Sequence, residues 1–164
     1  AIDISPSVFA YISLADQLRL AGLFLEAHKY LSLVSPEDIA ESEKYFYYIN
    51  LGKVFEDQFK IDEAIDCYSK CVDLPSVSST APFVLLGSLL AKQEKYKEAE
   101  EILKLGLEKE GDIDEVYYNL STIYARQGDF AKAIEAMERC IEIDYDCDSA
   151  HHFLADFKNI VGGS

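Results

Sequence analysis

The residue types that most often act as metal ligands or nucleophiles are sparse in this chain and poorly grouped. Cys67 and Cys71 stand one helical turn apart and could share a metal ion. The histidines do not complete such a site, because His151 and His152 are adjacent and point in different directions on a helix. We interpret Cys71 and Cys140 as small buried apolar residues, and we predict that the protein binds no metal and no cofactor.

Sequence motifs of enzyme chemistry are missing as well. The chain contains no P-loop, no G-x-S-x-G motif and no glycine-rich loop between a strand and a helix. Carboxylates are frequent, but 30 of the 164 residues are Asp or Glu, so close pairs arise without a catalytic reason. We therefore predict a protein that is not an enzyme.

Charge is the strongest global feature, since 30 acidic residues against 15 Lys and Arg give a net charge of −15. Such a surface repels phosphate backbones and anionic lipids, so we exclude nucleic acids and membranes as partners. The 49% hydrophobic content predicts one globular domain over residues 1–164. Reduced thiols favour the cytoplasm. We interpret the start at Ala1 and the closing Gly-Gly-Ser as the ends of an excised or processed chain.

A pattern of residue sizes recurs four times along the sequence. Its anchor is an alanine that follows a charged residue, with successive anchors 37, 35 and 34 residues apart: Ala27, Ala64, Ala99 and Ala133. A large residue stands four positions after each anchor: Leu31, Tyr68, Leu103 and Met137. Upstream of each anchor, a leucine is followed at once by a small residue: Leu14-Ala15, Leu51-Gly52, Leu86-Gly87 and Leu120-Ser121. Each unit therefore predicts two helices joined by a turn, with small residues that let the helices approach closely.

These spacings resemble the tetratricopeptide repeat family, whose period is about 34 residues. The resemblance implies an all-α, right-handed superhelical solenoid with repeats at residues 8–35, 45–78, 80–113 and 114–147. A capping helix is expected at 149–161, started by Asp148. The chain departs from the family pattern in having no tryptophan and a loosely spaced first repeat.

Serine or threonine before proline marks the expected helix starts. These starts are Ser5-Pro6, Ser35-Pro36 and Ser79 to Pro82. Residues 35–55 predict either one long first helix for the second repeat or a short extra helix leading into it.

The first helices of such repeats line a groove, and the resemblance implies which positions face it. The candidate groove residues are Ile12, Phe46, Ile49, Asn50, Lys53, Val84, Ser88, Lys92, Tyr118, Asn119, Thr122 and Arg126. Groove-facing charges balance, with acids Asp16, Glu56, Asp57 and Glu115 against bases Arg19, Lys53, Lys92 and Arg126. The apolar candidates form either a binding strip or ordinary packing between repeats.

Asn50 and Asn119 occupy the same position in repeats two and four. A side-chain amide both donates and accepts hydrogen bonds, and the resemblance implies that this pair holds a peptide main chain. Grooves of this family that grip a C-terminal carboxylate use lysines and an arginine as well. Only Asn50 matches that set, and Ile12 stands at a lysine position, so this role is not expected.

We predict a non-catalytic protein-interaction module that binds a peptide or helical segment of a partner protein. One alternative is a self-assembly module, present as a monomer or weak homo-oligomer. Another is a regulatory domain excised from a larger protein.

Overall fold

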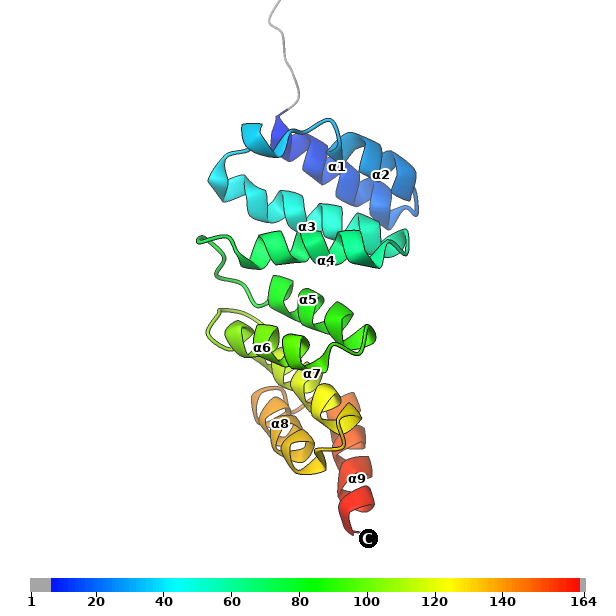
Figure 1. The fold of residues 1–164 in the computed structure, drawn as a ribbon, viewed down its shortest axis with the longest axis vertical. Coiled ribbons are helices and arrows are strands. Elements are labelled where there is room, and N and C mark those ends of the chain that lie inside the picture. The colour runs from blue at the N-terminus through cyan, green and yellow to red at the C-terminus, as the bar shows by residue number, and fades with distance from the viewer. Residues whose placement is uncertain (1–6, 163–164) are drawn as a thin grey trace, which may run out of the picture. The chain divides into compact units, whose positions relative to one another are not determined.

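The computed structural model describes residues 7–162, and every regular element among them is a helix (Figure 1). The first four α-helices are α1 (Val8–Leu20), α2 (Phe24–Leu31), α3 (Glu41–Asp57) and α4 (Ile61–Val72). The other five are α5 (Ala81–Lys92), α6 (Tyr96–Gly106), α7 (Ile113–Arg126), α8 (Phe130–Ile143) and α9 (Asp148–Gly162). The predicted fold class, an all-α solenoid of helical hairpins, is confirmed.

Helix starts follow local capping chemistry. Ser7 caps α1 by accepting a hydrogen bond from the Ala10 amide, whereas the predicted start at Ser5-Pro6 lies outside the described residues. Pro36 opens a separate short 3-10 helix, η1 (Pro36–Asp38), before α3 begins. The extra-helix alternative for residues 35–55 is therefore the correct one.

Contacts divide the chain into two compact units, and the boundary in the sequence lies between Val77 and Ser78. The first unit contains α1 to α4, and α3 packs against both α1 and α2. Its core is one cluster of buried side chains: Ile12, Ala15, Ala27, Leu31, Val34, Ile39, Tyr47 and Val54. One domain over residues 1–164 stays a prediction.

The second unit contains α5 to α9. Each hairpin packs within itself, α7 also contacts α5 and α6, and α9 covers α8. The loop before α7 closes onto the start of α5, because Thr80 donates its amide to the Glu110 carbonyl at 2.9 Å and its hydroxyl accepts the Asp112 amide at 3.1 Å. Thr80 is 2% exposed, so this connection is part of the core.

The predicted small-residue seam within each hairpin is present. All four anchor alanines are fully buried, and so are the large residues four positions later. A methyl group added to Gly52 would overlap the Tyr68 ring, 2.7 Å from Cδ1, and one added to Gly87 would lie 2.6 Å from Cγ of Leu103. The close approach of the two helices therefore depends on the absence of a side chain at these positions.

The four hairpin turns share one backbone feature, a left-handed residue with positive φ. The four residues are Gly22, Phe59, Glu94 and Gly128, with φ of 78°, 60°, 61° and 79°. Glycine adopts this conformation without steric cost, whereas a bulky side chain there is unusual. Phe59 is thus an exception in an otherwise ordinary turn.

The size match between Gly52 and Tyr68 gives a stability prediction. Gly52→Ala should lower the free energy of unfolding by about 1–3 kcal/mol, because the new methyl group overlaps a rigid buried ring. Adding Tyr68→Leu recreates the Ala15 and Leu31 pair of the first repeat, so the double variant should lose at least about 1 kcal/mol less than the two single losses added together. Urea unfolding of the three variants measures this coupling, and strictly additive losses would contradict it.

Candidate functional site

The candidate groove residues of the first unit lie on α1 and α3 and divide into core and surface. Phe46 is 47% exposed, and Asn50 and Lys53 are half-buried. Ile12 and Ile49 are only 3% and 7% exposed, because their side chains fill the core. These two isoleucines therefore offer no surface to a ligand, and for them packing is the correct alternative.

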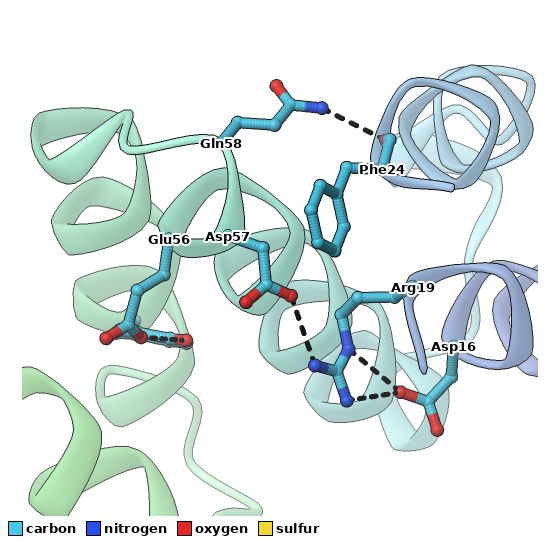
Figure 2. A network of polar contacts seen from close by, with 7 residues as sticks. Asp16, Arg19, Phe24, Glu56, Asp57 and Gln58 are labelled. Atoms are coloured by element: carbon cyan, nitrogen blue, oxygen red, sulfur yellow. Dashed lines mark hydrogen bonds and ion pairs between the residues drawn. The ribbon is translucent and has the colours of Figure 1, made fainter. Parts of the chain in front are cut away.

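Three charged groove residues of this unit, Asp16, Arg19 and Asp57, pair with one another. Figure 2 shows the Arg19 guanidinium between two carboxylates, 3.2 Å from Asp16 Oδ1 and 3.1 Å from Asp57 Oδ2. Burial lowers the pKa of Arg19, but the hydrogen bonds to Asp57 and Asp16 outweigh burial and leave that pKa raised. The network joins α1 to α3, so it positions the repeats.

The second unit brings five of the predicted residues together around one hollow. It has a volume of about 170 Å³ between α5 and α7 and is lined by Ser88, Ala91, Lys92, Asn119, Thr122, Ile123 and Arg126. Val84, also predicted for this surface, is 6% exposed and belongs to the core. Apart from Ala91 and Ile123, the lining residues are polar, with two cationic side chains and side-chain hydroxyl and amide groups.

The two groove asparagines have the same geometry in both units. Asn50 donates its side-chain amide to the Phe46 carbonyl at 2.8 Å, and Asn119 donates to the Glu115 carbonyl at 2.9 Å. Each bond spans one helical turn and restrains the side chain. The second N–H and the Oδ1 atom of each side-chain amide take no part in these bonds, and they are suited to hydrogen bonds with a peptide backbone.

Charge along the α7 surface is separated into two ends. A second hollow of about 300 Å³ surrounds the start of α7 and is lined in part by Asp112, Asp114, Glu115 and Tyr118. Burial raises the pKa of the Glu115 carboxyl, and the charges of Asp112 and Asp114 add to the effect. The acidic hollow and the hollow that contains Arg126 therefore mark opposite ends of one helix.

Sequence reasoning missed three residues of this surface. Asp112 precedes α7, and Asp114 lies outside the groove positions of the repeat, so the positional rule could not select them. Phe153 of α9 stacks edge-on against Tyr118, with ring centroids 5.8 Å apart. Leu154-Ala155 matches the pair of a leucine and a small residue that recurs in the four repeats. Phe153 stands directly before this pair, as Asn119 stands directly before Leu120-Ser121, so this register could have identified it.

Three of the four thiols are buried and therefore shielded from reagents. Burial raises the pKa of Cys67 and Cys71 to about 12 and that of Cys140 to about 11. Within residues 7–162, no three His, Cys, Asp or Glu side chains are grouped so that they could hold a metal ion. The interpretation of Cys71 and Cys140 as buried apolar residues is confirmed, since they are 0% and 1% exposed.

The family model described as tetratricopeptide repeat matches residues 47–76 and 114–147, close to the second and fourth predicted repeats. The chain contains tetratricopeptide repeats. No curated protein matches it. Among the described residues, no helix combines the length and the apolar character needed to cross a bilayer.

Solved structures with the same fold include other tetratricopeptide repeat proteins. A crystal structure of MamA is 25% identical, with a TM-score of 0.78 over 90% of this chain and 84% of MamA. YrrB, described as a TPR protein with an unusual peptide-binding site, is 20% identical, with a TM-score of 0.74 over 95% of this chain and 78% of YrrB. The second TPR domain of human RPAP3, solved with an HSP70 peptide, is 18% identical, with a TM-score of 0.67 over 73% of this chain and 98% of that domain.

Thiol accessibility in this repeat protein can be predicted from burial. At pH 8 a thiol reagent should modify one cysteine per folded chain, Cys147, because the other three are buried and protonated. All four should react after unfolding in urea. A Cys147→Ser variant should lose the fast reaction, and fast modification of Cys140 in the folded protein would contradict the prediction.

Proposed function

We propose that this protein is a non-catalytic interaction module that holds an extended segment of a partner protein along α5 and α7. The observation that carries the proposal is the hollow in which Ser88, Lys92, Asn119, Thr122 and Arg126 converge. Groups that donate and accept hydrogen bonds suit a peptide main chain, and the cationic groups suit acidic side chains. The solved complex of the RPAP3 domain and the description of YrrB support a peptide ligand.

The separation of charge along α7 specifies the ligand further. A basic side chain suits the hollow with Asp112, Asp114 and Glu115, and an acidic side chain suits the hollow with Lys92 and Arg126. Tyr118 and Phe153, whose rings contact each other, suit an apolar side chain between these ends. We propose a ligand that carries these three residue types in order.

A reducing compartment such as the cytoplasm suits this proposal. All four cysteines are free, and Cys147, near the acidic hollow, is partly exposed. An oxidising compartment would favour disulfide formation at such a thiol.

Peptides selected from a random display library provide the ligand for a first test. Replacing Asn119 by alanine should weaken binding of the selected peptides at least about tenfold, because buried backbone groups of the peptide lose their partner. The unfolding midpoint should stay unchanged, since Asn119 donates only to its own helix. Asn159→Ala, an exposed asparagine on α9, is the matched control. Equal affinity of the Asn119→Ala variant and the wild type would eliminate the role of Asn119 in holding the peptide.

Charge reversal tests where the peptide lies. Arg126→Glu should weaken binding of acidic selected peptides about tenfold or more and make the affinity less dependent on salt. Arg139→Glu makes the same change on α8, where Arg139 pairs with Glu142, and should leave binding unchanged. Isothermal titration at two salt concentrations provides the measurement. Equal losses in both variants would mean that net charge, and not the α5–α7 surface, governs binding.

A further inference from the structure

The first unit exposes large apolar side chains at the turns of its two hairpins. Leu20 is 71% exposed, Leu23 45%, Leu25 74% and Phe59 88%. The three leucines lie within six residues around the turn between α1 and α2, and Phe59 forms the turn between α3 and α4. We call these four residues the turn patch.

Two contacts hold the two turns side by side. Gln58 donates its side-chain amide to the Phe24 carbonyl at 3.0 Å, as Figure 2 shows. Arg19, just before Leu20, binds Asp57 at 3.1 Å. Residues next to those of the turn patch in sequence are thus bonded across the two turns, so the four exposed side chains belong to two neighbouring turns.

The other repeats show that the fold does not require apolar residues at these positions. The position of Leu20 is held by Asp57, Lys92 and Arg126. Lys60, Lys95 and Asp129 stand where the first repeat has Leu23. Asp62, Lys97 and Ala131 stand at the position of Leu25.

Phe59 is the least expected member of the patch. Its left-handed backbone position is occupied by Gly22, Glu94 and Gly128 in the other turns. A bulky residue there works against the backbone, and at 88% exposure its ring gains little from packing within the chain. Its apolar surface is available to an external partner.

We propose that the turn patch is a twofold interface between two copies of this chain. The four side chains expose on the order of 400 Å² of apolar surface, the size at which a patch on a monomer is often functional. Two such patches bury about 800 Å² in total, below the roughly 1,600 Å² of a standard interface, so the dimer is weak.

Charge favours a second copy over a lipid surface. The rim of the turn patch carries both signs, with Lys29 and Lys60 beside Glu26 and Asp62. In a twofold contact the lysines of one copy can face the carboxylates of the other. The net charge of −15 repels anionic bilayers, and it also opposes the approach of a second copy, which adds to the weakness of the dimer.

Sedimentation of the full chain from about 10 µM to about 1 mM tests the proposal in the concentration range of a weak interface. The mean mass of the wild type should rise toward that of two chains. Two variants should each weaken dimerisation at least about tenfold. The first is Phe59→Gly, which introduces the residue type found at Gly22 and Gly128. The second combines Leu23→Lys with Leu25→Asp, which introduces the residue types of the second repeat. These variants should fold, since other repeats carry the same residues. Leu105→Lys removes a 50% exposed leucine from α6, at a position held by Lys70 and Arg139 elsewhere, and should dimerise like the wild type.

Three results would overturn the proposal. These are a wild type that stays monomeric at every concentration, dimers unaffected by both sets of substitutions, and binding to phosphatidylcholine vesicles that is lost with Phe59→Gly. The last result would place the patch in a lipid surface. Because the turn patch lies on other residues than Asn119 and Arg126, a failure of dimerisation leaves the peptide-binding test unaffected.

Discussion

The arrangement of this protein depends on one steric constraint, the small residue under a large one in every hairpin. Gly52 lies against Tyr68 and Gly87 against Leu103, so close that a single methyl group would overlap. Ser121 adapts the same position differently, because its buried hydroxyl donates to the Ala133 carbonyl at 2.6 Å and so satisfies its own polarity. The seam fixes the distance between the two helices of each hairpin. The faces of the first helices that point away from the seam are left for other contacts.

The sequence predicts the seam well because it is a matter of size and spacing. Large and small residues at fixed intervals determine which helix faces meet, and the buried anchor alanines follow directly. Predicting exposure is harder. Ile12 and Ile49 stand at positions that the family geometry assigns to the groove, yet a branched side chain there is long enough to reach the core. Position along a helix sets the direction of the Cα–Cβ bond, whereas burial depends also on which neighbours surround it.

The candidate site was predictable only where it lies on regular helix. Asn119, Thr122 and Arg126 repeat at helical spacing along α7, and they line the same hollow. Asp112 lies in the loop before α7, where no periodicity applies, and its place depends on the tertiary bond from its amide to Thr80. Phe153 was missed, because it belongs to a helix that resembles only the start of a further repeat, and its position before Leu154-Ala155 is the one sequence signal that could have identified it.

Charged side chains are arranged differently in the two units. In the first unit Arg19 binds two carboxylates. Its bond to Asp57 connects the two turns that carry the apolar turn patch. In the second unit the positions that correspond to Leu20 carry Lys92 and Arg126, and both line a hollow on the surface. The same repeat position is thus apolar at one point of the chain and cationic at another, although the backbone is the same. Because the hairpin is held by its seam, its turns and outward faces are free to vary, and one repeat design can present two surfaces of opposite chemistry.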